Sequence, residues 1–115
     1  MSAATAFKII TADDWAAAQL AGAYEGSAVD RADGYIHLST AEQLVETARR
    51  HYAGRNDLRL LEVDLAPLGE TVVWEASRGG ALFPHIYGPL PTRAVVADRS
   101  MTVSAEGEMT LDTGA

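Results

Sequence analysis

The order of helical and extended patterns along the 115-residue chain is the feature that most constrains its fold. Two helical patterns come early, and extended apolar runs occupy most of the chain that follows. The regular strand–helix alternation that builds a parallel sheet is missing. The sequence therefore predicts an α+β fold, in which two early helices pack on a mixed, mainly antiparallel sheet.

The second helical pattern is the clearer of the two. Its apolar residues recur at the i, i+3, i+4 and i+7 spacing of an amphipathic helix, and they are Ala41, Leu44, Val45, Ala48 and Tyr52. Two overlapping capping boxes can begin this helix, Ser39 with Glu42 or Thr40 with Gln43. We expect the helix to end at Gly54, because glycine commonly follows the last helical turn.

The first helix is predicted to begin after Thr11, whose side chain can cap it, and to stop near Gly22. Residues 6–10, just before it, are predicted to form a strand. Residues 23–34 show no clear periodicity and are predicted to form a loop. Three residues of the first helix are expected to face the core: Trp15, Ala18 and Leu20.

The other extended runs are predicted strands. They cover residues 35–38, 58–65, 71–76, 94–97 and 101–103. The runs at 58–65 and 71–76 are close enough in sequence to form a hairpin. Residues 78–91 contain three prolines and three glycines, so they are predicted to be mostly loop. The tail from residue 105 onward is acidic and small, and we expect it to fray.

Composition bounds the class of protein. The length suits one domain, residues 1–115, with a core at about 6–104. The net charge of −7 has the wrong sign for an extended nucleic-acid surface. Eight of the nine basic residues are arginine, whose planar fork suits the capture of a single phosphate or carboxylate. There is no cysteine, signal-peptide pattern or membrane-spanning run, so we expect a cytoplasmic protein without membrane association.

Residues 74–89 hold a dense group of reactive side chains. Glu75 lies near the end of a predicted strand, where a carboxylate can act as a general base, orient a ribose hydroxyl or stabilise a cation. An ion pair with Arg78 is the structural alternative. Arg78, Gly79 and Gly80 can hold an anion through the guanidinium and backbone amides, but a tight turn explains the glycines equally well.

Three aromatic rings alternate in the same segment: Phe83, His85 and Tyr87. An extended backbone would place them on one side, where they could form a wall for a planar ligand. Packing of Phe83 and Tyr87 in the core explains the pattern equally well. A metal site is not predicted, because the histidines and carboxylates lack local ligand spacing.

His37 stands just before the second helix, where the backbone N–H groups of a helix N-terminus can bind an anion. A partly buried histidine bonded to neighbouring backbone is the alternative. For Ser39 and Thr40 capping alone is the favoured explanation, because their spacing to Glu42 and Gln43 already accounts for them.

Three ordered segments carry a resemblance to a known family: GYIHLST (34–40), WEASRGG (74–80) and LFPHIYGPL (82–90). They are similar to the signature segments of a small bacterial family of unknown function, numbered 952, and the resemblance runs from about residue 7 to 103. The family is grouped by fold with ADP-ribosyltransferase-like proteins. A grouping by fold does not by itself establish an activity.

The resemblance implies roles around a bound NAD. His37 would contact the ribose, with Ser39 or Thr40 beside it, and Tyr87 could stack on a nicotinamide-like ring. Glu75 would supply the late carboxylate that stabilises an oxocarbenium-like state. Because His85 follows Glu75 in the chain, the assignment of that carboxylate stays open.

The hypothesis is a pocket for a small anionic ligand, nucleotide or NAD-like, in which the segments 37–40 and 74–89 face one another. The chain could then be an ADP-ribosyltransferase-like enzyme that uses His37 and Glu75. A non-catalytic ligand-sensing module or a protein-interaction module is the alternative. The sequence identifies no protein partner.

Overall fold

A computed structural model describes residues 5–77 and 79–111 of the chain. Its helices are α1 (Ala12–Ala21), α2 (Ala28–Asp33) and α3 (Ala41–His51), with two 3-10 segments, η1 (Ala66–Thr71) and η2 (Thr92–Ala94). Its strands are β1 (Thr5–Thr11), β2 (Ala23–Tyr24), β3 (Ile36–His37), β4 (Leu58–Asp64), β5 (Val72–Ser77), β6 (Ala81–Ile86), β7 (Leu90–Pro91), β8 (Val95–Val103) and β9 (Met109–Leu111). The predicted α+β class with antiparallel pairing is confirmed.

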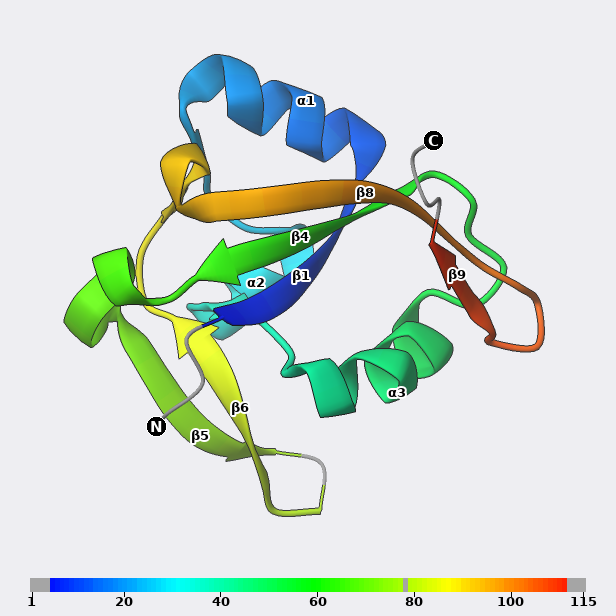
Figure 1. Ribbon diagram of the computed structural model, residues 1–115. Coiled ribbons are helices and arrows are strands. Elements are labelled where there is room, and N and C mark those ends of the chain that lie inside the picture. The colour runs from blue at the N-terminus through cyan, green and yellow to red at the C-terminus, as the bar shows by residue number, and fades with distance from the viewer. Residues whose placement is uncertain (1–4, 78, 112–115) are drawn as a thin grey trace.

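The larger sheet has the strand order β1-β4-β8-β9, with β1 at one edge (Figure 1). Helices α1 and α3 lie on opposite sides of it. Successive residues of a strand point to opposite faces, so β1 sends Ala6 and Ile10 into the core with α1 and Ile9 into the core with α3. Strands β1 and β4 are therefore covered on both faces, which explains the nearly continuous apolar run of β4.

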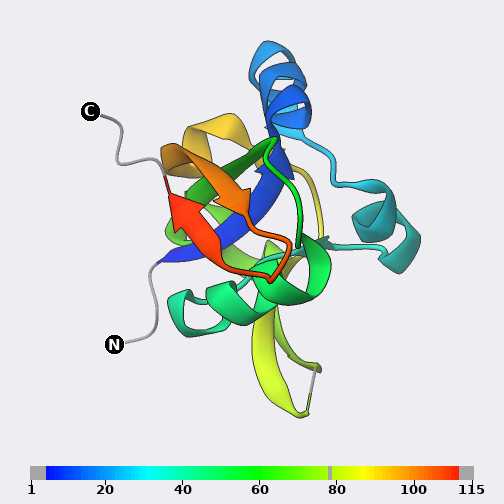
Figure 2. The ribbon, with the colours of Figure 1, turned by 90° about the vertical axis from the view of Figure 1, so that its right-hand side faces the viewer.

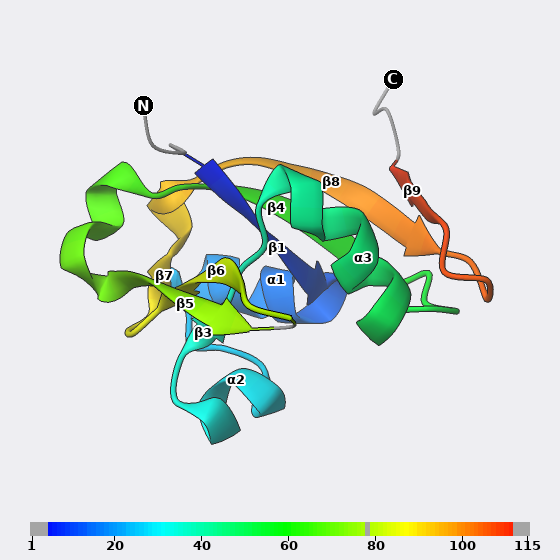
Figure 3. The same ribbon diagram turned by 90° about the horizontal axis from the view of Figure 1, so that it is seen from below.

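The smaller sheet has the order β3-β6-β5, and its β5–β6 hairpin extends away from the body (Figure 2). Helix α2 lies beside β3, on the far side of that strand from the larger sheet (Figure 3). A two-residue pairing of β2 with β7 completes the sheets of the described ranges. The short strand β3 pairs His37 with His85 of β6, which joins two of the sequence segments singled out above.

The helix starts follow the sequence closely, but α3 ends at His51 with Tyr52 as its C-cap, earlier than the predicted Gly54. Thr11 caps α1 through a hydrogen bond from the backbone N–H of Asp14 (3.1 Å), and Gly22 ends α1 with φ 88°. The capping box that begins α3 is the one between Thr40 and Gln43.

Some predicted core positions are wrong. Leu20 is 92% exposed and Val45 is also exposed, because α1 and α3 bury narrower faces than the apolar spacing suggested. Trp15, Ala18, Leu44 and Ala48 are buried as predicted.

The loop predicted for residues 23–34 is wrong. It contains β2 and α2, and α2 begins with a capping box between Ser27 and Asp30. The carboxylate of Asp30 accepts from the backbone N–H of Ser27 at 2.9 Å, and the Ser27 hydroxyl accepts from that of Asp30 at 3.1 Å. A helix of this length has too few apolar positions to show a periodicity, so its capping residues were the sequence feature that could have predicted it.

The predicted hairpin between residues 58–65 and 71–76 does not form. The segment η1 separates the two strands and buries Leu68, so that β4 pairs with β1 and β8 while β5 joins the other sheet. The predicted strands 94–97 and 101–103 are parts of one strand, β8.

The prediction that residues 78–91 are mostly loop is also wrong, because β6 lies within them. Pro84 occupies the middle of this strand opposite Trp74, and its carbonyl accepts a hydrogen bond from the Leu38 backbone N–H at 3.0 Å. A proline in a central strand is unusual, which is why its presence argued against a strand. In the tail, β9 is ordered against β8, and residues 112–115 lie outside the described ranges.

Candidate functional site

A cavity of about 610 Å³ runs along the outer edge of β1. Five consecutive β1 residues, from Phe7 to Thr11, line it. On this side of β1 the described neighbour is an isolated bridge between Phe7 and Ser39, whose backbones exchange hydrogen bonds of 2.7 and 2.8 Å. Side chains from α2, α3, β3 and β6 complete the wall. His37, Ser39, Phe83 and His85 are among them, so the cavity joins both segments in which the sequence placed its candidate residues.

His37, on β3, lies between two carboxylates. Its Nδ1 is 2.6 Å from Oδ1 of Asp30, and its Nε2 is 2.9 Å from Oδ2 of Asp33. Both acids belong to α2, which begins with the capping box and turns them toward the strand. An imidazole can donate from both nitrogens only as an imidazolium, so this arrangement favours the doubly protonated ring.

Asp30 is the buried centre of the polar network, with 2% of its surface exposed. Besides the bonds to His37 and Ser27, its Oδ2 accepts from Nζ of Lys8 at 2.9 Å. Burial raises the pKa of Asp30, but the hydrogen bond from His37 and the charge of Lys8 outweigh it and hold the pKa well below its ordinary value. Asp30 is therefore ionised at neutral pH.

Lys8 is the only lysine of the chain and is 5% exposed. Burial lowers the pKa of this amine, and the neighbouring Asp30 opposes that shift. The pair is costly to bury, because each ion loses its hydration, and it depends on the hydrogen bonds that satisfy both groups. It anchors α2 to β1 directly behind His37.

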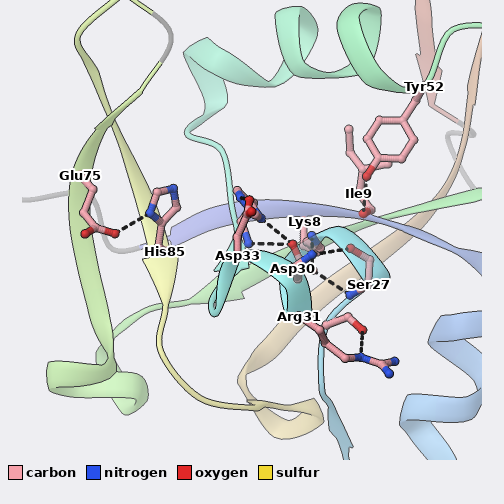
Figure 4. Close-up of polar contacts among 11 residues, drawn as sticks. Lys8, Ile9, Ser27, Asp30, Arg31, Asp33, Tyr52, Glu75 and His85 are labelled. Carbon is pink, nitrogen blue, oxygen red and sulfur yellow. Dashed lines mark hydrogen bonds and ion pairs between the residues drawn. The ribbon is translucent and has the colours of Figure 1, made fainter.

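His85, on β6, forms the second histidine–carboxylate pair (Figure 4). Its Nδ1 lies 2.7 Å from Oε1 of Glu75, which reaches across from β5, and the phenol of Tyr87 donates to the same oxygen at 2.8 Å. These hydrogen bonds, first that from His85, lower the pKa of Glu75. The same carboxylate raises the pKa of Tyr87.

The tautomer of His85 follows from these contacts. An ionised carboxylate only accepts hydrogen bonds, so the proton shared with Glu75 belongs to Nδ1 of the ring. In the neutral imidazole Nε2 is then an acceptor. Within the described ranges no protein group hydrogen-bonds to Nε2, although His85 is 4% exposed and lines the cavity.

Tyr35 holds the two pairs together. Its ring stacks on that of His85 with centroids 4.1 Å apart, and it also touches the rings of His37 and Tyr87 at 4.8 and 5.1 Å. The two imidazole centroids are 5.3 Å apart in an edge-to-face arrangement. The structure thus brings His37, Glu75, His85 and Tyr87 into one cluster.

The other candidate residues have different surroundings. Ser39 is buried, and its hydroxyl is 2.9 Å from that of Thr47 in the cavity wall. Thr40 caps α3 and is not among the cavity-lining residues. Phe83 is buried and lines the cavity.

The glycine-rich turn lies away from the cavity. Gly79 and Gly80 have φ values of 73° and 92°, in the left-handed region that favours glycine, and they connect β5 to β6. Neither lines the cavity. Arg78 lies outside the described ranges.

Four members of the cluster were not found from the sequence: Lys8, Asp30, Asp33 and Tyr35. The available signals were the Ser-x-x-Asp capping spacing before Gly34, and a single lysine within an apolar strand. Neither signal reveals its partner, because 22 positions separate Lys8 from Asp30.

Two further properties of the described ranges bear on function. No group of three or more His, Asp or Glu side chains there is arranged to hold a metal ion. No helix there is long and apolar enough to cross a membrane.

Comparison with known proteins places the chain in a family. The family model "Protein of unknown function (DUF952)" matches residues 9–98. The crystal structure of protein CC0527 from Caulobacter crescentus is 47% identical, with a TM-score of 0.87 over 92% of this chain and 93% of that one. The solution NMR structure of CC0527 is likewise 47% identical and superposes with a TM-score of 0.80 over 92% and 91% of the two chains. No curated protein matches. The chain therefore belongs to the DUF952 family of proteins of unknown function.

Proposed function

We propose that the chain binds a small anionic ligand, of the nucleotide or NAD-like class, at the end of the cavity walled by His37 and His85. One observation carries the proposal: two imidazoles from separate strands, each bonded to a carboxylate, lie 5.3 Å apart in the wall of a cavity of about 610 Å³. Ligand sites commonly have such volumes and combine apolar walls with a few convergent polar groups.

The contacts suggest how an anion would be held. The side chain of Asp33 is about half exposed, so an anionic group of the ligand can take its place on Nε2 of His37. Nε2 of His85 can accept from a ligand hydroxyl. Glu75 and Tyr87 are not among the cavity-lining residues, so the exposed ring of Tyr87 offers a face only to a planar group that extends beyond the cavity. In this proposal Glu75 acts through His85.

The three histidines allow a direct test by NMR. Their imidazole C–H signals, assigned with His→Gln variants at positions 37, 51 and 85, are followed while NAD, ADP-ribose or inorganic phosphate is added. We expect saturable shifts of the His37 and His85 signals with at least one nucleotide, and weaker binding when either residue is replaced. If neither signal moves at millimolar concentrations of all three compounds, the proposal is wrong.

A charge variant sharpens this test. Asp33→Asn removes the carboxylate that competes for Nε2 of His37 and should tighten anion binding by about fivefold, the effect of one unit charge a few ångströms away in water. Asp13→Asn is the matched control, because it makes the same change in net charge on α1 at a residue that does not line the cavity. Equal affinities of the two variants would contradict the predicted position of the anion.

Turnover of NAD is the finer form of the proposal. Release of nicotinamide from NAD, lost in Glu75→Gln with binding retained, would support an ADP-ribosyltransferase-like enzyme in which His37 and Glu75 serve the reaction. Binding without nicotinamide release by either form would favour a ligand-sensing module.

A protein-interaction module is the second candidate, because the projecting β5–β6 hairpin exposes apolar side chains. Trp74 is 38% and Leu82 55% exposed, and neither lines the cavity. Sedimentation velocity of the wild type and of a Trp74→Ser, Leu82→Ser double variant would show whether the hairpin mediates self-association. A monomer at all concentrations would contradict that form of the candidate.

A further inference from the structure

We propose that the two imidazoles are an acid–base pair that hydrolyses a phosphodiester of the bound ligand, with His85 as general base and His37 as general acid. The inference rests on the proposed anion-binding cavity and adds to it a reaction class and a role for each ring. It follows from the different hydrogen-bond states that the surroundings impose on two neighbouring histidines.

His85 has the state required of a base. Its Nδ1 proton is committed to Glu75 at 2.7 Å, so Nε2 carries the lone pair. Tyr35 stacks on one side of the ring and Tyr87 fixes the carboxylate, so the orientation of the imidazole is set from two directions. Nε2 has no protein partner among the described residues, and His85 lines the cavity, so this nitrogen can accept a hydrogen bond from water or from a ligand.

His37 has the state required of an acid. Each of its ring nitrogens lies beside a carboxylate oxygen, and a carboxylate oxygen accepts hydrogen bonds. Only an imidazolium can donate to both oxygens at once. Asp30 is itself fixed by Lys8 and by the backbone of Ser27, so Nδ1 is held firmly. Asp33 is the more exposed of the two carboxylate partners. When the ligand displaces Asp33, the Nε2–H of His37 becomes free to donate to the ligand.

The pair suits a reaction that needs both a proton acceptor and a proton donor. Hydrolysis of an unactivated phosphodiester requires water to lose a proton and an alkoxide leaving group to gain one. Cleavage of the bond between nicotinamide and ribose in NAD needs no proton donor, because the positively charged ring leaves as neutral nicotinamide. The acidic state of His37 would have no use in that reaction, so the geometry favours the phosphodiester.

The step is balanced within the site. Nε2 of His85 takes a proton from water as the water oxygen bonds to phosphorus, and the bond between phosphorus and the leaving oxygen breaks. The Nε2–H of His37 protonates that oxygen. His85 is left protonated and His37 neutral, and exchange of one proton with solvent restores both rings. Glu75 and Tyr87 are positioning residues, because they reach the reaction only through His85.

The test uses two phosphodiesters whose leaving groups differ. One is 2′,3′-cyclic AMP, whose ribose oxygen needs a proton, and the other is bis(p-nitrophenyl) phosphate, whose leaving group does not. We expect hydrolysis of both, followed by ³¹P NMR and by absorbance. His85→Gln should slow both by at least about 100-fold, the usual contribution of one acid–base group. His37→Gln should slow the cyclic nucleotide by a similar factor and the nitrophenyl ester much less.

The pH profile separates the roles further. A bell-shaped kcat/KM is expected for the cyclic nucleotide, and His37→Gln should lose its alkaline limb because no acid remains to be deprotonated. Glu75→Gln should change the acidic limb, since it removes the carboxylate that accepts the Nδ1 proton of His85. Glu106→Gln, an exposed acid in the turn before β9, is the matched control and should leave both limbs in place.

The wild type provides a check if the buried His85 variant fails to fold. Long-range ¹H–¹⁵N imidazole spectra should show the Nδ1–H tautomer for His85 and hydrogen bonds from both ring nitrogens of His37. The opposite tautomer of His85 would overturn the assignment of the base. If 2′,3′-cyclic AMP shifts the imidazole signals of His37 and His85 but neither phosphodiester is hydrolysed, the proposed reaction is wrong while the proposed anion site stands. If no anion binds, both proposals fall.

Discussion

The two main sheets are built by the same antiparallel pairing but carry different side chains at their centres. The inner strand β4 of the larger sheet presents Leu61 and Val63, which are fully buried, to one apolar core. The middle strand β6 of the smaller sheet presents His85, which is also buried, at 4% exposed, but is bonded to Glu75. Apolar packing and the candidate site are thus divided between the sheets, and Lys8 of β1 bonds to Asp30 of α2, the helix beside the smaller sheet.

The largest expected effect concerns the ion pair behind His37. Asp30→Ala leaves the buried Lys8 amine without its partner, so unfolding in urea should show a loss of about 3–5 kcal/mol. Asp33→Ala, a half-exposed acid on the same helix, should cost far less. Similar losses for both would mean that the smaller sheet is not anchored by a buried charge.

Substitutions in the core of the larger sheet should change stability through packing alone. Leu61→Ala removes a fully buried side chain and should lower the free energy of unfolding by about 2–5 kcal/mol through lost burial and the cavity left behind. Leu82→Ala, in the exposed hairpin, should change it by less than about 0.5 kcal/mol. Chemical denaturation measures the free energy of unfolding of both variants. Equal losses would mean that Leu82 is buried in solution by another molecule.

Acid should weaken the polar network more than the apolar core. The folded-state pKa of Asp30 lies below its unfolded value of about 4, so below that pH the unfolded chain binds a proton that the folded chain does not. The stabilisation is present above pH 4 and is lost progressively as the pH falls. The free energy of unfolding of Asp30→Asn should therefore depend less on pH between 4 and 2 than that of the wild type, and equal slopes would contradict the assignment.

The smallest expected effect concerns the start of α3, which connects the two sheets. Gln43 bonds the backbone of Thr40 and, through Nε2, the carbonyl of Leu82 in the hairpin at 2.7 Å. Thr40→Ala should cost about 1 kcal/mol by removing the cap. Glu42→Ala should cost less, because the Ser39–Glu42 capping box suggested by the sequence is not the one used. Thermal unfolding can rank the two variants, and the reverse order would contradict the observed cap.

The sequence predicted those features that depend on neighbouring residues. Thr11 and Gly22 marked α1, and the apolar spacing marked α3, because caps and periodicity act within a few positions. Helix α2 was missed because its six residues are too few for a periodicity. Strand β6 was missed because Pro84 is a strong local signal against a strand, which pairing with β5 and β3 overrides.

The candidate site divides in the same way. Local chemistry pointed to His37, Glu75, His85 and Tyr87, which the structure brings together through the pairing of β3 with β6 and of β6 with β5. It could not show that Glu75 bonds to His85, nor that Asp30 and Asp33 bracket His37.

The sequence by itself determined the α+β class, the caps of α1 and α3, and which two segments are rich in reactive groups. Only the tertiary structure decided the order of the strands, the burial of Lys8 with Asp30 and the hydrogen-bond state of each histidine. The physical reason is range. Capping and periodicity depend on residues within one or two turns of chain, whereas the state of an imidazole depends on partners that strand pairing brings from distant positions.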